Sequence, residues 1–479
     1  MENSARHEDE SFSRDYLSLR AKEAGLVDLF FLLVSPDMRR LRWIEWRGSD
    51  MEGKLLEFEH RWIIFASVLA QKLLVLSRGT LAAVGWMIEL VLNLLANNCG
   101  LFNLLVNILT GNLVVPDRES ATFRSVIWSF DSRKELQGKR NLPSLALNAS
   151  KLAYENHAFS ETVVVEHWKM EFLGSFAFWN DYQGRSSTRA MIVKSDNLVV
   201  VAFRGTQPFD SDDWCTDIDI SWYEIESVGR VHFGFMKALG LHHPKRSHET
   251  VASKSYAYHY IKQRLCMILE NDESMKFMVT GHSLGGALAI LFMAGLVIQK
   301  EEQMLCRLEG VRTFGQPRVG DADFCEYMDK KIAEYGIKYE RYVYSNDLVP
   351  RLPFNDKNFM FKHFGDCLYY SSLFYWRKVS NSRSDYTPHF GFLPVPSQVL
   401  AEEPNKNYFS LKWAILNTLN AIWELLRSFI LPIIYGPGYQ ETWVMLLLRT
   451  FSLVIPGIAE HVLQDYDNLT RLNPPTAEQ

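Results

Sequence analysis

The sequence predicts an α/β fold in which helices flank a mainly parallel sheet. Four short runs rich in apolar and β-branched residues are typical of buried strands, at residues 197–206, 276–283, 311–317 and 339–345. Helical segments separate the later runs, and this alternation indicates parallel strands joined by helices. With 479 residues, the chain is long enough for a large catalytic core and an additional region.

Composition divides the chain into an N-terminal region of residues 1–120 and a larger region of residues 121–479. The first region carries the longest apolar stretch, at residues 79–115, and the second contains the predicted strands. Within the second region, residues from about 365 to about 440 have the character of an insertion. The insertion contains an amphipathic to apolar segment at 411–436, for which a packed helix pair and a membrane contact are both open.

Residues 79–115 contain a single charged side chain, Glu89. The turn-like sequence at 97–100 divides this stretch into halves, each shorter than the roughly 20 residues that span a bilayer. Small and polar residues recur every three or four positions and so form one helical stripe among the leucines. They are Gly85, Glu89, Asn93, Asn97, Gly100, Asn103, Asn107 and Gly111. We expect a hairpin or in-plane helix that enters a single lipid leaflet and returns, with a buried helical cap as the alternative.

The composition also excludes several classes of function. The net charge is −5 and no strongly basic segment is present, so we expect no nucleic-acid partner. The six cysteines are scattered singly, which predicts neither a disulfide framework nor a zinc site, and we expect no metal or cofactor. The polar, acidic N-terminus lacks the order of a signal peptide, so a reducing, cytosol-facing location is expected.

Ser283 lies between Gly281 and Gly285, at the spacing of a nucleophile elbow. An apolar strand precedes the serine and an Ala- and Leu-rich helix follows it. Small flanking residues suit a serine that is held at strained dihedral angles between a strand and a helix. The helix N-terminus also favours negative charge beside the serine. These flanks favour an activated serine over a structural Gly-Ser turn.

A serine nucleophile needs a base, and the base needs an orienting carboxylate. In α/β-hydrolases both follow the serine along the chain, the acid before the histidine. Asp347 comes directly after the predicted strand at 339–345, at the strand end where α/β sheets place functional groups. Spacing alone does not choose among the three later histidines, His363, His389 and His461.

The core resembles the class 3 lipases, a family that includes the fungal triacylglycerol lipases. Five segments carry the resemblance in the family's order: VVVAFRGT at 199–206, VHFGF at 231–235, TGHSLGGALA at 280–289, FGQPRVGD at 314–321 and NDLVPRLP at 346–353. PFDSDDWCTDIDISW, KHFGDCLYY and the long apolar N-terminal region are similar to the plant oil-body lipase branch. The resemblance implies an α/β-hydrolase-type sheet, with an apolar N-terminal helical region and a helical insertion before the catalytic histidine.

By this resemblance, Ser283 is the nucleophile, Asp347 is the orienting acid, and the late histidine His461, followed by Tyr466, is the base. His363 stays the alternative base, because the chain-order template fixes sequence and not distance.

An oxyanion hole needs two hydrogen-bond donors aimed at the developing negative charge. The first expected donor is the backbone N–H of Leu284, directly after the nucleophile. The second, implied by the resemblance, is the backbone N–H of Thr206, whose hydroxyl is expected to add a further bond.

Residues from about 206 to 226 are expected to form a lid. Trp214, Ile218, Trp222 and Ile225 fall on one helical face, which would cover the serine in water and lie on lipid when open. A surface amphipathic helix is the alternative. A calcium loop is disfavoured, because the acidic residues here do not follow the alternating pattern of such loops.

The resulting hypothesis is a serine lipase that hydrolyses triacylglycerol at the cytosolic face of a lipid droplet and releases free fatty acids through an acyl-enzyme on Ser283. The expected partners are triacylglycerol and a lipid-droplet monolayer or membrane surface, with the endoplasmic reticulum as a second location. Two alternatives stay open: a phospholipase A1 or galactolipase acting on polar membrane lipids, and a catalytically silent droplet protein. The sequence predicts no oligomeric state.

Overall fold

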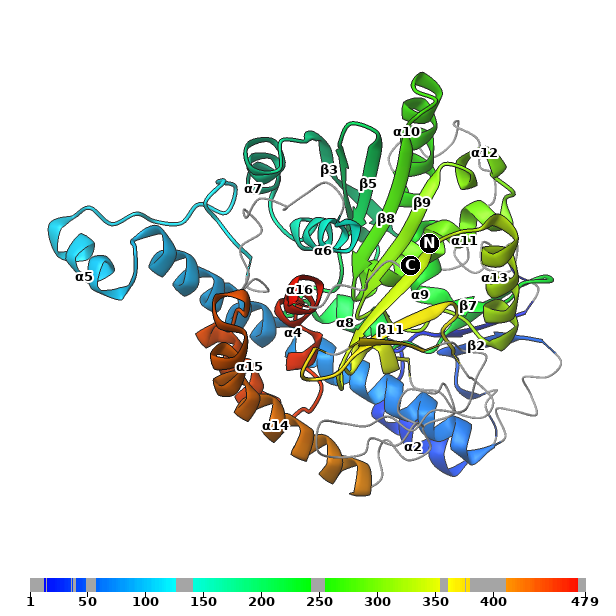
Figure 1. Ribbon diagram of the computed structural model, residues 1–479. Coiled ribbons are helices and arrows are strands. Elements are labelled where there is room, and N and C mark those ends of the chain that lie inside the picture. The colour runs from blue at the N-terminus through cyan, green and yellow to red at the C-terminus, as the bar shows by residue number, and fades with distance from the viewer. Residues whose placement is uncertain are drawn as a thin grey trace.

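The computed structural model describes residues 13–48 apart from 14, 36, 38 and 39, then 57–125, 141–242, 255–353, 361–379 apart from 375, and 411–472. Helices and strands alternate through the larger part of these ranges (Figure 1). Four strands occupy the runs predicted from the sequence: β5 (Leu198–Phe203), β8 (Lys276–His282), β9 (Leu308–Phe314) and β10 (Tyr339–Tyr344).

An eight-stranded sheet forms the centre of the molecule, in the order β12-β11-β10-β9-β8-β5-β4-β3. The strands from β11 to β5 run parallel, while β12 at one edge and β4 and β3 at the other pair antiparallel. The outer strands are β3 (Glu171–Asn180), β4 (Arg185–Lys194), β11 (Asp366–Tyr370) and β12 (Trp376–Val379). The predicted α/β fold with a mainly parallel sheet is therefore confirmed.

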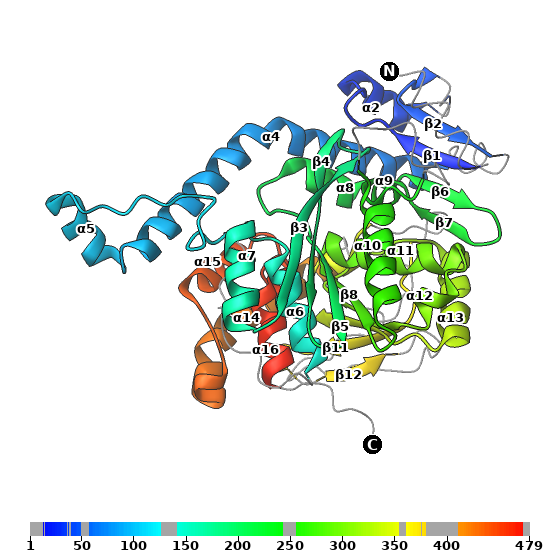
Figure 2. The same cartoon turned by 90° about the horizontal axis from the view of Figure 1, so that it is seen from above.

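Helices cover both faces of this sheet (Figure 2). One face carries α9 (Phe233–Leu239), α10 (Ala257–Asn271), α11 (Leu284–Ile298), α12 (Glu302–Leu305) and α13 (Ala322–Tyr335); the other carries α6 (Leu142–Leu152), α7 (His157–Thr162) and α16 (Leu463–Leu472). Along β5, Val199 and Val201 enter the first hydrophobic core and Val200 and Ala202 enter the second. A strand buried on both faces has continuous apolar sequence, which is why β5 was recognisable.

A second, four-stranded antiparallel sheet joins the N-terminal region to the larger region. Its order is β2 (Ile44–Arg47), β1 (Tyr16–Leu19), β6 (Trp222–Ile225) and β7 (Gly229–His232), and α2 (Leu26–Val34) packs beside it. Because the two regions share this sheet, they do not separate at residue 120 in space. The division near residue 120 stays a proposal about function.

The long helix α4 (Phe58–Asn97) corrects one expectation about the apolar stretch. The first half of that stretch is not a short helix, because the helix begins 21 residues before Gly79 and has 40 residues in all. The charged residues before Gly79 hid this continuity, since they interrupt apolar composition without breaking a helix. Among the described residues, α4 is the one helix long and apolar enough to cross a membrane, judged by length and composition. The predicted turn at 97–100 is confirmed, since Asn98–Gly100 separate α4 from α5 (Leu101–Thr110).

The distal part of α4, α5 and the returning segment up to residue 124 project from the body as an arm (Figures 1 and 2). Asparagine side chains hold the returning segment to the helices. The Asn93 amide donates to the carbonyl of Arg124 at 2.8 Å and accepts its N–H at 2.9 Å. The Asn98 amide bonds both backbone groups of Val114, at 2.9 and 3.1 Å, and accepts a bond from Asn107. Two residues of the predicted stripe, Asn93 and Asn107, thus bond within the arm, whereas Asn103 is exposed. Apolar side chains are exposed on α5, among them Leu101, Phe102, Leu105 and Leu109.

The predicted lid helix ends early. α8 (Ser211–Ile218) holds Trp214 and Ile218, but Trp222 and Ile225 lie on β6, so the expectation of one shared helical face was wrong. The carboxylate of Asp219 accepts the backbone N–H and hydroxyl of Ser221 at 3.2 and 2.7 Å, which ends the helix in a turn. The strand then pairs with β1, some 200 residues earlier, a partner that local periodicity does not reveal.

The described part of the predicted insertion contains α14 (Leu411–Tyr435) and α15 (Trp443–Phe451). The 3-10 turn η6 (Ala459–His461) and α16 follow. Residues 380–410 of the insertion lie outside the described residues.

Candidate active site

Ser283 stands at the turn between β8 and α11 with φ of 59° and ψ of −134°. A side chain at positive φ is strained unless its surroundings fix it, and a serine nucleophile is presented in this way. The flanking glycines make the turn possible. A Cβ at Gly281 would lie 2.1 Å from the carbonyl oxygen of Gly285, and one at Gly285 would lie 2.2 Å from that of Phe203. The geometry is that of a nucleophile elbow.

Asp347 and His461 form a hydrogen-bonded pair. The Nδ1 atom of His461 lies 2.9 Å from each carboxylate oxygen of Asp347, although the two residues are 114 positions apart. Asp347 is fully buried in the turn after β10 and also accepts the hydroxyl of Tyr466 at 2.6 Å and the N–H of Val349 at 3.0 Å. These donors hold the carboxylate oriented toward the imidazole.

His282, the residue before the serine, links the elbow to His461. The two imidazole rings stack with centroids 4.5 Å apart, and Nε2 of His282 lies 2.8 Å from the backbone oxygen of His461. A carbonyl oxygen only accepts, so Nε2 carries the proton. Burial and the neighbouring His461 lower the pKa of His282 well below its usual value, so the ring is neutral and Nδ1 accepts the hydroxyl of Tyr154 at 2.9 Å.

The structure therefore places Ser283 past the carboxyl end of β8 and Asp347, with its partner His461, past the carboxyl end of β10. The Ser283 hydroxyl is buried and has no hydrogen-bond partner within the described part of the chain. The bond from serine to histidine is not formed in this conformation, and such bonds often tighten only with substrate present.

The other two histidines are placed differently. His363 is buried, and its Nε2 atom lies 2.8 Å from the backbone oxygen of Pro350. Burial lowers its pKa well below the usual value, with nearby arginines adding to the effect. It does not bond the Asp347 carboxylate, whereas His461 does. His389 lies outside the described residues.

The two expected oxyanion donors flank the elbow. Leu284 is the first residue of α11, and Thr206 follows β5. Neither backbone N–H is bonded to another group among the residues described here. The Thr206 hydroxyl donates to Asp217 at 2.6 Å, so the further bond expected from this hydroxyl is not available in this conformation. Burial raises the pKa of Asp217 to about 8.

The helix α8 lies under α4. Ser67 of α4 donates to the carbonyl of Ile218 at 2.9 Å, and Arg78 pairs with Asp212 at 3.1 Å. A Cβ at Gly85 would lie 2.6 Å from Phe209, so α4 crosses the loop before α8 in close contact. The segment expected as a lid is thus covered by the helix that leads into the arm.

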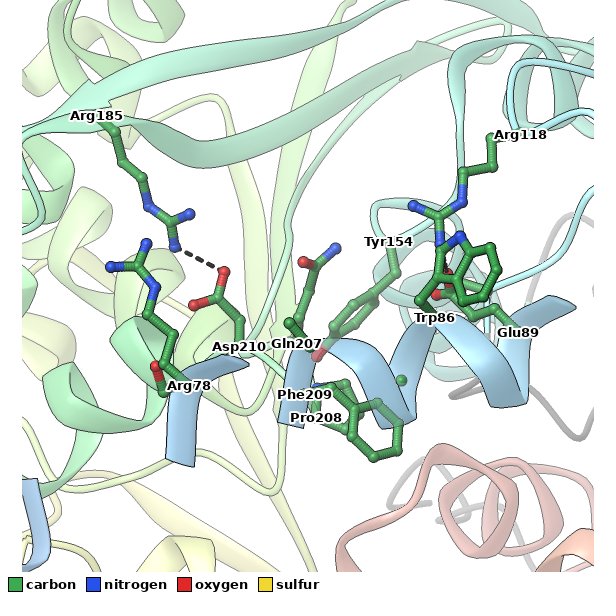
Figure 3. Close-up of a pocket in the computed structure, with 14 residues that line it drawn as sticks. Arg78, Trp86, Glu89, Arg118, Tyr154, Arg185, Gln207, Pro208, Phe209 and Asp210 are labelled. Carbon is green, nitrogen blue, oxygen red and sulfur yellow. Dashed lines mark hydrogen bonds and ion pairs between the residues drawn. The ribbon is translucent and has the colours of Figure 1, made fainter. Parts of the chain in front are cut away.

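A cavity of about 290 Å³ lies between α4 and the turn that follows β5 (Figure 3). Arg78, Trp86 and Glu89 line it from α4, and residues 207–210 line it from the turn. Tyr154, two residues after the end of α6, reaches into the same space (Figure 3). The cavity therefore connects the underside of α4 with the tyrosine that bonds the histidine next to the serine.

Comparison with known proteins places this geometry in a family. The family model described as Lipase (class 3) matches residues 200–357. The triacylglycerol lipase OBL1 of Arabidopsis thaliana is 36% identical over 515 residues, which cover 96% of this chain and 95% of that protein. The chain belongs to the class 3 lipase family.

Two further matches were found. The triacylglycerol lipase OBL1 of Ricinus communis is 36% identical over 96% of this chain and 95% of its own length. Lipase II from Rhizopus niveus, a solved structure, aligns with 48% of this chain and 78% of its own at 24% identity, with a TM-score of 0.36. As a class 3 lipase, the chain is a carboxylic ester hydrolase.

Several groups around the lipase site were not foreseen from the sequence. Tyr154 lies in the turn after α6, 128 positions before its partner His282, and no local motif marks it. Asp217 lies within the segment expected as a lid but was not singled out, and its bond to Thr206 depends on how α8 packs. Among the described residues, no group of three or more His, Cys, Asp or Glu is arranged to hold a metal ion.

Proposed function

We propose that this class 3 lipase is a serine hydrolase of triacylglycerol that acts at a lipid–water interface. The observation that carries the proposal is the strained Ser283 elbow, which His282 ties to the backbone of the same histidine that pairs with Asp347. In this assignment Ser283 is the nucleophile, His461 is the base and Asp347 orients it.

The mechanism follows from these positions. The Ser283 Oγ atom attacks the ester carbonyl carbon while Nε2 of His461 takes the hydroxyl proton. The N–H groups of Leu284 and Thr206 stabilise the resulting oxyanion. When the C–O bond breaks, the imidazolium of His461 protonates the departing diacylglycerol oxygen, and the acyl group remains on Ser283. Water, deprotonated by His461, then attacks the acyl carbonyl carbon; the bond to Ser283 breaks, His461 returns the proton to the Oγ atom, and the fatty acid is released.

Two features support triacylglycerol as the substrate. The relatives that match nearly the full chain are named triacylglycerol lipases. The arm supplies a contact with bulk lipid, because apolar side chains are exposed along α5 and at residues 113–115 and because its asparagines bond its own backbone. We place the enzyme on the cytosolic face of a lipid droplet, with the endoplasmic reticulum membrane as the second location.

The packing of α4 favours a droplet monolayer over a spanned bilayer. α4 packs against the body at Gly85 and lines a cavity with it at Trp86 and Glu89, which leaves residues 90–97 and α5 as the part available to lipid. Both pieces are shorter than the roughly 20 residues that span a bilayer. The arm thus enters one leaflet and returns. Residues 1–120 act as the lipid-associating region, and residues 121–479 form the lipase domain.

We further assign the lid to residues 206–226 together with the part of α4 that covers them. The Ser283 hydroxyl is inaccessible in this conformation, so substrate entry requires displacement of a covering element. The arm and the cover belong to one continuous helix, which connects lipid contact with opening.

The test is hydrolysis of emulsified triolein by wild type and by Ser283→Ala, with phosphatidylcholine and galactolipid vesicles as parallel substrates. We expect fatty-acid release from triolein that the variant loses by at least about 10³-fold. Activity retained in the variant overturns the nucleophile assignment. A preference for either polar lipid overturns the substrate assignment in favour of a phospholipase A1 or galactolipase.

A further inference from the structure

The two helices before the catalytic histidine turn their charges inward. From residue 415 to residue 455 the chain carries four charged side chains, Glu424, Arg427, Glu441 and Arg449. All four are buried against the body, and both arginines have no exposed surface. Surface helices of soluble domains show the opposite arrangement, with charges toward water.

These charges form one buried ion cluster with Asp465 of α16. Arg449 donates to Glu424 at 3.1 Å and to Asp465 at 2.9 Å, and Arg427 reaches the same two carboxylates. Since each charge has a partner of opposite sign, the cluster fixes α14 and α15 onto α16. It also dictates which side of each helix faces outward.

The outward side of both helices is apolar. On α14, exposed apolar side chains recur at helical spacing at Ile415, Leu419, Ile422, Leu426, Phe429 and Ile433. Ile433 is 84% exposed. On α15 and just beyond it, the exposed side chains are Trp443, Leu447, Phe451 and Val454. We call this surface the platform face.

We propose that the platform face is a second lipid-contact surface, distinct from the arm, which holds the active site against the apolar interior of a lipid monolayer. The proposal rests on the proposed function at an interface. A lipid occupant fits because no charged side chain from residue 415 to residue 455 faces outward, and acyl chains need none. The helices α14 and α15 and the arm also lie on the same side of the molecule in both views (Figures 1 and 2).

The inner side of α14 bonds both catalytic segments. Glu424 accepts the hydroxyl of Ser345, two residues before the catalytic acid, at 3.2 Å. Asn420 donates to Glu460, the residue before the catalytic histidine, at 3.2 Å. A lipid surface in contact with α14 therefore lies one helix diameter from the acid–base pair. The arm alone would anchor the chain without setting this distance.

The test compares single charge insertions in the full chain. Ile433→Glu and Trp443→Glu place a carboxylate on the platform face, and Met267→Glu is the matched control on the exposed side of α10, away from both lipid surfaces (Figure 1). Each protein is floated with triolein droplets coated with phosphatidylcholine, and hydrolysis of the triolein is measured beside that of soluble p-nitrophenyl butyrate. We expect both platform variants to lose droplet binding and triolein hydrolysis by about 10-fold or more, with the soluble ester unaffected and the control like wild type.

Droplet binding and triolein hydrolysis that match wild type in both platform variants overturn the proposal. Failure of the proposed function is a separate result, since wild type would then release no fatty acid from triolein while still floating with droplets. A measurement on unaltered protein guards against misfolded variants. Wild type is bound to droplets whose phosphatidylcholine carries a diazirine in its acyl chain, and is photolabelled. Labels in peptides from 415 to 455 as well as from the arm support the proposal, and labels in the arm alone overturn it.

Discussion

The carboxyl group of Asp217 offers a quantitative test of the packing beside the oxyanion turn. It lies fully buried on α8 and accepts the Thr206 hydroxyl at 2.6 Å. Burial raises its pKa to about 8, whereas an aspartate in an unfolded chain titrates near about 4. The folded protein therefore keeps a proton on Asp217 at pH values at which the unfolded chain has released it.

The sign of the effect on stability follows from this difference. Between about pH 4 and about pH 8 the folded state binds more protons than the unfolded state, so the free energy of unfolding falls as the pH rises. The stabilising contribution of the neutral carboxyl is fully present below about pH 4 and is lost as the pH rises through about 8. Each pH unit in this window costs about 1.4 kcal/mol.

Asp217→Asn removes this titration and keeps an oxygen that accepts the Thr206 hydroxyl. From pH 4.5 to pH 7 we expect the difference in unfolding free energy to move by about 3 kcal/mol in favour of the variant, measured by urea unfolding at a series of pH values. Asp219 and Glu460, whose pKa values burial raises to about 6 and about 8, are present in both proteins and cancel in the difference. If the difference in unfolding free energy between wild type and Asp217→Asn stays constant from pH 4.5 to pH 7, Asp217 does not titrate as described.

Three further substitutions test the packing around the site. Gly285→Ala puts a methyl group 2.2 Å from the backbone oxygen of Phe203, and we expect at least a ~100-fold loss of kcat/KM for p-nitrophenyl butyrate; near-normal activity would contradict the elbow geometry. Tyr466→Phe removes the 2.6 Å bond to Asp347, so kcat should fall by about 10-fold at unchanged KM; a change below about 2-fold would show that the carboxylate does not depend on it. Arg449→Met leaves the acids of the ion cluster with one arginine and should lower the free energy of unfolding by about 3–5 kcal/mol in urea titrations; a loss under about 1 kcal/mol speaks against the cluster.

The local parts of this architecture could be predicted from the sequence. β5 and β8 are buried on both faces, so their apolar runs are continuous and easily recognised. Ser283 could be found because the elbow needs small residues on both sides within five positions, and Gly281 and Gly285 do approach backbone atoms too closely for any side chain. Asp347 was foreseen for a similar reason, since it directly follows a predicted strand.

The remaining features depend on contacts between distant segments. His461 is distinguished from His363 by its bond to the carboxylate of Asp347, which lies 114 positions earlier in the chain. The order of the residues along the chain does not fix such a distance. Trp222 was assigned to a helical face because its spacing from Trp214 suits a helix, yet pairing with Leu17 of β1 places it on a strand. The length of α4 was missed because the stretch at 79–115 was delimited by its apolar composition. The helix continues through the charged residues before Gly79, which that criterion left out.

The central claim is that Ser283 is activated by His461 held on Asp347. The most direct measurement is labelling of the full chain with a fluorophosphonate probe, with the adduct located by peptide mass spectrometry. We expect one adduct, on Ser283, formed at least about 10³-fold more slowly in His461→Ala. An adduct on another residue, or equal labelling of the two proteins at Ser283, would contradict it.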